Sequence, residues 1–138
     1  MTSLMIDTGA FVAQRIPGDQ YHALATSAFA ELADSSVRLF STEHILDETV
    51  TMLGRRESYA YAAETGTELL NSRVLQWLDA GVAEWTTALR MMRKYADQAV
   101  SFTDCLTFAL MKREGIRTVF GFDHHFHAVG FRVWPPAR

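Results

Sequence analysis

A chain of 138 residues is long enough to bury a substantial core within one domain. Hydrophobic residues make up 49% of it and charged residues 21%, a composition that excludes an intrinsically disordered chain. The formal net charge of −3 excludes a protein that attracts nucleic acid through an overall basic field, although a local basic rim would still suffice to bind RNA.

Cys105 is the single cysteine, so no disulfide can form within the chain and a reducing compartment is favoured. Its place in an apolar stripe indicates a buried structural thiol and not a nucleophile. The opening segment MTSLMIDTGA lacks the basic and long apolar regions of a signal peptide. No apolar run reaches the length of a transmembrane helix. We therefore expect a soluble cytoplasmic protein.

The first predicted element is a strand over residues 3–6, a short apolar run typical of a central strand that is buried on both faces. The turn after it begins with Asp7 and leads into a short helix that Pro17 breaks. Taken alone, Asp7 is most simply interpreted as a helix N-cap. A longer helix, capped by Asp19, is predicted to reach residue 33. Its buried stripe comprises Tyr21, Leu24, Ala28 and Leu32.

A second strand is predicted over residues 37–40, followed by a helix that Ser41 or Thr42 caps and Gly54 ends. One face of this helix is apolar and therefore predicted to be buried. Three acids lie off that face: Glu43, Asp47 and Glu48. The periodicity does not decide which of the three has a role beyond facing solvent, which is the ordinary role of such side chains.

Residues 58–70 are predicted to form a helix and residues 74–77 a third strand. Asp79 is predicted to cap a further helix that ends near Tyr95. Its apolar stripe, predicted to be buried, comprises Val82, Trp85, Leu89 and Met92.

The segment SFTDCLTFALMKREGI predicts a helix with clear ends. Ser101 is suited to cap it, with Asp104 three residues later as in a capping box. Gly115 stops the helix. A strand over residues 116–120 follows, and Gly121 begins the turn that carries Asp123. The tail ends in a possible edge strand over residues 131–134, closed by two prolines.

Short strands that alternate with helices predict a parallel sheet with helices on both faces. In such a sheet the residues that follow the strands gather at one edge, where ligands bind. Asp7 follows the first strand, Asp123 follows the fourth, and Asp104 begins a helix. We therefore expect these three acids to converge.

Four segments, in this order and at these distances, resemble those of the PIN-domain nucleases, and within them the VapC-like toxins. They are LMIDTGAFVA, TEHILDETVTML, SFTDCLTFALMKREGI and TVFGFDHHF. The resemblance covers nearly the full length and implies one domain over residues 1–138. The implied fold is an α/β/α sandwich with a small, mainly parallel twisted sheet of four to five strands. The implied activity is metal-dependent cleavage of RNA.

The resemblance also implies a set of site residues. The first family acid falls on Asp7, the third on Asp104 and the fourth on Asp123. The second falls on Glu48, because the family pattern has a Thr followed six positions later by a Glu, here from Thr42. Thr8 and Thr103 match hydroxyl positions that support the acids. Asn or Ser replaces none of the four acids, so nothing marks an inactive nuclease.

Carboxylates suit this chemistry because hard oxygen ligands hold Mg²⁺ or Mn²⁺ and leave positions open for water and phosphate. A bound metal polarises the phosphoryl group and lowers the pKa of water. Four carboxylates close together repel, and without a cation at least one should hold a proton. The cluster therefore predicts a divalent metal.

Other interpretations compete with this one. His124, His125 and His127 crowd around Asp123 and could form a zinc site, although the usual ligand spacing is absent. Otherwise His125 is expected to hydrogen-bond near the acids or to contact RNA. A phosphoacceptor receiver domain also places acids at strand ends, but it needs adjacent acids after the first strand, where this chain has Asp7 and Thr8. A haloacid-dehalogenase phosphatase needs D-x-D there, and position 9 is Gly.

Substrate and partners follow only from the resemblance. VapC-like proteins pair with a small antitoxin and form homodimers, whereas a housekeeping PIN nuclease would have no antitoxin. The sequence does not indicate which RNA is cut. A rim of basic side chains could hold its phosphates: Arg55, Arg56, Arg90, Arg93, Lys94, Lys112 and Arg113. The segment from Ser58 to Tyr95 is predicted to form the protein interface, with aromatic anchors at Tyr59, Tyr61, Trp77 and Trp85.

Overall fold

β1 is the central strand of a five-stranded sheet in which every neighbouring pair is parallel. The computed structural model describes residues 1–136, and residues 137 and 138 of the predicted domain lie outside the described part. The strand order is β3-β2-β1-β4-β5. The strands are β1 (Ser3–Ile6), β2 (Arg38–Thr42), β3 (Leu75–Leu78), β4 (Thr118–Phe120) and β5 (Arg132–Trp134). The predicted parallel sheet is confirmed.

The order of the strands reverses between β1 and β4. From β1 the chain adds β2 and β3 on one side, then returns to add β4 and β5 on the other side. Ile6 pairs with Phe120 in the register of β1 and β4. Ligands of open α/β sheets bind in the crevice beyond the carboxyl ends of the strands at such a reversal. The fold therefore points to the residues that follow Ile6 and Phe120.

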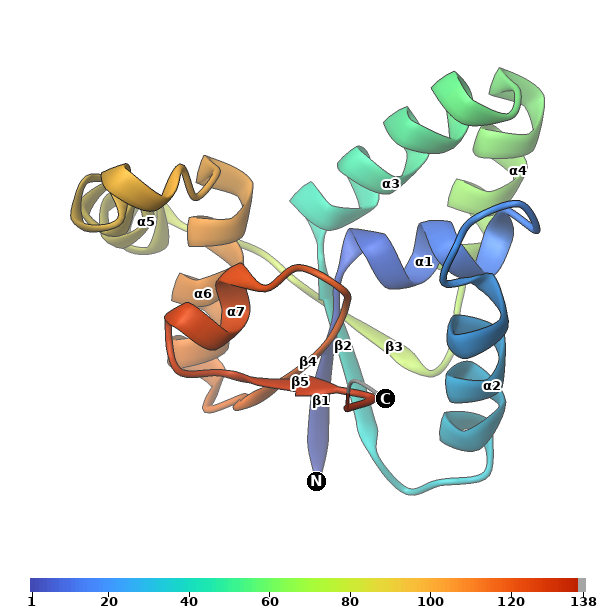
Figure 1. Cartoon of the computed structure of the whole chain (residues 1–138), viewed down its shortest axis with the longest axis horizontal. Coiled ribbons are helices and arrows are strands. Elements are labelled where there is room, and N and C mark those ends of the chain that lie inside the picture. Colours follow the sequence, from blue (N-terminus) through green and yellow to red (C-terminus); the bar gives the residue numbers. More distant parts are fainter. Residues whose placement is uncertain (137–138) are drawn as a thin grey trace.

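Helices cover the sheet on both sides, as predicted (Figure 1). One group is α1 (Thr8–Arg15), α2 (His22–Ala33), α3 (Glu43–Arg56) and α4 (Tyr59–Leu70). The other is α5 (Val82–Lys94), α6 (Phe102–Glu114) and α7 (His125–Ala128), with a short 3₁₀ turn at Ala96–Gln98 ahead of α6. The sequence did not predict α7, where it indicated only a turn.

The core has two parts. The larger one surrounds β1, whose Leu4, Met5 and Ile6 are fully buried. It extends across both faces of the sheet, and the middle of α6 is buried on all sides, Cys105 included. A smaller cluster of Val12, Ile16, Leu53 and Ala62 joins α1 to the α3–α4 pair. Among the residues the structure describes, no helix combines the length and the hydropathy needed to cross a membrane.

Three predicted helix boundaries are wrong. α3 continues past Gly54 to Arg56. Gly54 lies inside the helix against the start of α4, where a Cβ would lie 2.8 Å from the Tyr59 ring. Asp19 does not cap α2; its carboxylate accepts the N–H of Tyr21 in the turn before the helix. Asp79 does not cap α5 either, since Gly81 is the N-cap and Glu84 accepts its N–H at 2.8 Å.

The predicted buried stripe of α5 is wrong, and that of α2 is wrong in part. Val82, Trp85, Leu89 and Met92 of α5 are all exposed, because α5 packs through its other apolar face, Ala88 and Met91. A small Ala lets α5 approach its neighbour closely, whereas the larger stripe faces outward. In α2 the buried side chains are Ala25, Ala28 and Leu32, and Tyr21 lies at the surface against Phe122.

Candidate active site

Asp7 follows β1 and stands at the edge of the sheet where the strand order reverses. Its side chain is only 7% exposed. It occupies the N-cap position of α1 but makes no side-chain capping bond, so the simple capping interpretation is wrong. The end of β4 comes very close to it: a Cβ on Gly121 would lie 3.1 Å from the Cβ of Asp7 and 3.3 Å from its Oδ2. Glycine at position 121 is therefore what lets the β4 turn reach Asp7.

Asp104 enters from the first turn of α6. The helix begins as predicted, with the Ser101 hydroxyl accepting the N–H of Asp104 at 3.1 Å. The cap and the buried helix behind it fix the backbone at this position. The Asp104 carboxylate then faces the β4–α7 turn, where its Oδ2 lies 3.7 Å from Nδ1 of His125.

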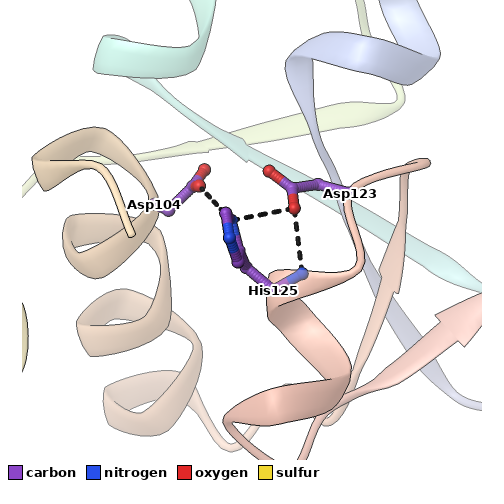
Figure 2. Close-up of side chains that lie close together, drawn as sticks. All are labelled: Asp104, Asp123 and His125. Atoms are coloured by element: carbon purple, nitrogen blue, oxygen red, sulfur yellow. Dashed lines mark hydrogen bonds and ion pairs between the residues drawn. The ribbon is translucent and has the colours of Figure 1, made fainter. Parts of the chain in front are cut away.

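Asp123 and His125 are held as a unit by α7. Phe126 is fully buried and meets Phe108 of α6 edge-on at 5.1 Å, which fastens α7 to α6. The Asp123 Oδ1 accepts the N–H of His125 at 2.9 Å, a local turn typical of Asp. The same oxygen lies 3.0 Å from Nδ1 of His125. Figure 2 shows the imidazole between the two carboxylates, with Asp104 on one side and Asp123 on the other.

Glu48 comes from the middle of α3, and a half-buried histidine near the start of that helix contacts α6. Thr42 caps α3 by accepting the N–H of Ile45 at 3.1 Å. Nε2 of His44 lies 3.1 Å from the Thr42 hydroxyl and 2.9 Å from that of Thr107 on α6, three residues beyond Asp104. Burial lowers the pKa of His44 to about 4, so this link is neutral. It ties the start of α3 to the helix that carries Asp104.

A cavity of about 370 Å³ brings the four predicted acids together. Asp7, Glu48, Asp104 and Asp123 all line it, whereas the exposed Glu43 and Asp47 do not. Among the residues that line it there is no Lys or Arg. His125 and Thr8 also line it, and the buried Thr8 hydroxyl has no hydrogen-bond partner within the described part of the chain. Thr103 does not line it; its carbonyl accepts a bond from Thr107 at 3.1 Å.

Two acids of this cavity, Asp7 and Asp104, resist ionisation. The pKa of Asp7 is raised from 3.8 to about 8, first by burial and then by the charges of three other acids, Asp104, Glu48 and Asp123; the Thr8 N–H opposes this rise. The pKa of Asp104 is raised to about 6; burial is the largest cause, and the negative charge of Asp123 is the next largest. No Lys or Arg among the described residues that line the cavity compensates this charge, so the cavity favours an external cation over four ionised carboxylates.

The donor set fits a hard divalent cation. Asp104, Asp123 and His125 offer ligand atoms that lie within 4.8 Å of one another, and Asp7 and Glu48 line the same cavity. The carboxylate oxygens suit Mg²⁺ or Mn²⁺, and one imidazole is compatible with Mn²⁺. Of the three histidines proposed for zinc, only His125 joins this group among the described residues. His124 and His127 are exposed, so the competing three-histidine zinc site does not form.

Sequence reasoning missed several residues that shape the cavity. His44 carried no signal that separated it from an ordinary surface histidine near a helix start. Gly121 was assigned only to a turn, because close approach to Asp7 becomes visible only across β1 and β4. Ala99 and Met52 also line the cavity. Ala99 adopts a left-handed conformation at φ 52°, a conformation that residues other than glycine rarely adopt.

The fold and this cavity define the class of protein to which the chain belongs. Residues 4–132 match the family model of the PIN domain, and the chain belongs to that family. The resemblance inferred from the four sequence segments is thereby confirmed. The receiver interpretation is wrong, since receiver domains have the strand order 2-1-3-4-5 and this sheet has β3-β2-β1-β4-β5.

Among its relatives, the chain is similar to the 23S rRNA-specific endonuclease VapC20 of Mycobacterium tuberculosis. The two are 28% identical over 129 residues, which cover 93% of this chain and 95% of VapC20. The crystal structure of M. tuberculosis VapC20, a sarcin–ricin loop cleaving toxin, superposes with a TM-score of 0.85 at 26% identity, over 93% of this chain and 95% of that one.

A second solved structure supports the fold alone. It is the crystal structure of VapBC2 from Rickettsia felis bound to a DNA fragment from the promoter, with a TM-score of 0.66 and 12% identity. The match covers 95% of this chain and 96% of the other.

Proposed function

We propose that residues 1–138 form one nuclease domain that cleaves RNA with Mg²⁺ or Mn²⁺, as the toxin of a toxin–antitoxin pair. The observation that carries this proposal is the convergence of four acids on one cavity that no Lys or Arg lines. Membership in the PIN family and the similarity to an rRNA-specific endonuclease support it.

Each acid has a proposed role. Asp104 and Asp123, which face each other across His125, would hold the metal directly. Asp7 and Glu48 would complete the ligand set, either directly or through water. A divalent cation bound here would neutralise charge on the phosphoryl group and lower the pKa of attacking water. His125 would keep the Asp123 carboxylate in place through its N–H, and Thr8 would supply a hydroxyl to the acids.

The proposed substrate is a structured ribosomal RNA. VapC20 is described as cleaving the sarcin–ricin loop of 23S rRNA, and that loop is the first substrate to test here. Cleavage of ribosomal RNA would place the protein in the cytoplasm. The basic side chains predicted to form a rim would hold phosphates. Arg56 and Arg113 are the least available of the predicted rim, because they already pair with Asp19 and with Glu84 and Glu114.

The decisive experiment is cleavage of a sarcin–ricin loop RNA by purified protein with Mg²⁺, with Mn²⁺ and with EDTA. Wild type should cleave only with metal, and Asp104→Asn should lose cleavage while its circular dichroism spectrum and melting temperature show an intact fold. Asp34→Asn, at an exposed acid outside the cavity, is the matched control and should stay active. An active Asp104→Asn protein, with contaminating nuclease excluded, would refute the assignment.

We also propose two protein partners. A VapB-like antitoxin is supported by the similarity to VapC20 and by the fold shared with a VapBC complex. A second copy of this chain would cover the exposed apolar stripe of α5, where Trp85 is 51% and Leu89 57% exposed. Tyr61 and Trp77 suit that role less well: Tyr61 donates to the Arg15 carbonyl at 2.8 Å, and Trp77 packs near Phe11. Light scattering of wild type and Leu89→Glu would test the dimer, which the variant should lose.

A further inference from the structure

A second, larger cavity lies directly beside the acidic one. It has a volume of about 820 Å³, within the range of cavities that bind small ligands. Its walls come from α2, from the turn between β4 and α7, and from the end of β5, which lies beside α2 (Figure 1). Phe122 and Asp123 line both cavities. A molecule bound at the acids can therefore extend into the second cavity without leaving the protein surface.

The chemistry of this second cavity differs from that of the first. Asp123, at the shared boundary, is its only acid, and no Lys or Arg lines it among the described residues. It therefore offers no Lys or Arg to a phosphate, and the candidate metal group of the described residues, Asp104, Asp123 and His125, belongs to the acidic cavity. Aromatic, aliphatic and imidazole groups make up most of the walls of the second cavity, with the Ser27 hydroxyl and the Gln20 amide as neutral hydrogen-bonding groups. Such a lining suits a planar, uncharged and polar-edged ligand.

A ready-made aromatic platform stands at the boundary of the two cavities. The rings of Tyr21 and Phe122 stack with centroids 4.2 Å apart and planes 8° apart. Tyr21 was predicted to be buried in the core but is 38% exposed, and its ring lines the cavity instead. His124 and His127 are exposed and also line the second cavity. Unstacked RNA bases bind to side chains of this kind, by stacking on Tyr, Phe or His and by hydrogen bonds to the base edges.

We propose that this second cavity binds the base of an unpaired nucleotide next to the scissile phosphate, with Tyr21 and Phe122 as its stacking platform. The proposal rests on the proposed ribonuclease function and adds a place where the enzyme reads RNA. The acids act on a phosphate, which carries no sequence information, whereas a base in this cavity meets Ser27 and Gln20 at its edge. The cavity would therefore select which phosphodiester bond enters the acidic site.

The test is a double-mutant cycle between protein and RNA, measured by fluorescence anisotropy. The protein is Asp104→Asn with Mg²⁺, so that binding is measured without cleavage. The RNA is a labelled sarcin–ricin loop hairpin, together with versions in which one loop nucleotide at a time lacks its base. Tyr21→Ala should weaken binding of the intact RNA about tenfold, within the range for one base stacked on an aromatic side chain. One abasic RNA should show the same loss, and Tyr21→Ala should weaken that RNA no further.

Two further variants keep the result interpretable. Tyr59→Ala makes the same chemical change at an exposed tyrosine on α4, outside the cavity, and should leave binding unchanged. Ser27→Trp fills the cavity from α2 and should weaken binding as Tyr21→Ala does, which covers the case in which Tyr21→Ala fails to fold. The proposal is overturned if both cavity variants bind the intact RNA like their parent, or if Tyr21→Ala weakens every abasic RNA by the same factor.

Failure of the base-binding proposal can be distinguished from failure of the nuclease proposal. Wild type that cleaves the loop while both cavity variants bind normally would leave the nuclease standing and remove the base site. Wild type that cleaves no RNA, together with a coupled loss in the cycle, would remove the nuclease and leave a nucleotide-binding cavity.

Discussion

Replacing Asp7 with asparagine tests the electrostatics of the acidic cavity without any substrate. Burial and neighbouring carboxylates raise the pKa of Asp7 from 3.8 to about 8 in the folded protein. Between these two values the folded state keeps a proton that the unfolded state releases. The stability that this proton provides is fully present below about pH 4 and is lost as pH rises towards 8. In metal-free wild type, Asp7 should therefore lower the free energy of unfolding by about 1.4 kcal/mol per pH unit in this window.

An asparagine side chain cannot ionise, so Asp7→Asn should lack this contribution. Relative to wild type, the variant should gain about 4 kcal/mol in unfolding free energy between pH 5 and pH 8, from three pH units at 1.4 kcal/mol each. That gain is large against a total stability of about 5–15 kcal/mol for a typical domain. Comparing the two proteins at both pH values cancels pH effects of other groups and any constant cost of a buried amide.

The assay is urea unfolding at pH 5 and pH 8 with EDTA, followed by circular dichroism. Asp34→Asn removes an exposed acid and should differ from wild type equally at the two pH values. If Asp7→Asn also differs from wild type by the same amount at both, to within about 1 kcal/mol, Asp7 ionises normally in the fold. The argument for a repulsive, cation-requiring cluster would then be wrong.

Three other predictions concern the metal, the second acid and the backbone. With EDTA, Asp123→Asn should melt no lower than wild type, because it removes a negative charge beside Asp104. Mn²⁺ at 100 times its Kd should stabilise wild type by roughly 2.7 kcal/mol and Asp123→Asn by much less. Equal stabilisation of the two proteins by Mn²⁺ in thermal melts would contradict this. In single-turnover assays, Glu48→Gln should slow RNA cleavage more than about 100-fold. Glu43→Gln, at an acid outside the cavity, should cleave RNA at nearly the wild-type rate. The reverse result would make Glu43 the second acid. Gly115→Ala should lower unfolding free energy by about 1 kcal/mol because φ is +68°. Gly18→Ala, which meets nothing within 4 Å, should be neutral or slightly stabilising in the same urea titration.

Local sequence was sufficient for most elements and for their order. The apolar run of residues 3–6 was typical of a buried central strand and forms one, and Ser101 and Gly115 mark the two ends of α6 as predicted. These features depend on neighbours within a few residues, such as a hydroxyl that accepts an N–H three residues on. Alternation of strands and helices then allowed only a parallel sheet. Asp7, Asp104 and Asp123 were placed near one another by this logic, since strand ends and a helix start share one edge.

The tertiary structure decided what local patterns leave open. Periodicity shows that α5 has apolar side chains but not which of its two apolar faces is covered, because that depends on how closely α6 can approach Ala88. Periodicity likewise leaves three acids of α3 equivalent. The buried face of α3, Ile45, Thr49 and Leu53, together with the His44 contacts to Thr42 and Thr107, leaves Glu48 on the side that lines the cavity.

The second cavity and the close approach of Gly121 to Asp7 both depend on contacts between distant parts of the chain. Phe122 meets Tyr21, and Gly121 meets Asp7, only after strands and helices far apart in the chain are brought side by side. The sequence specifies each residue of these contacts, but the contacts themselves are set by the order of strands in the sheet. The reversal between β1 and β4 opens the crevice, and packing around it determines which side chains line it.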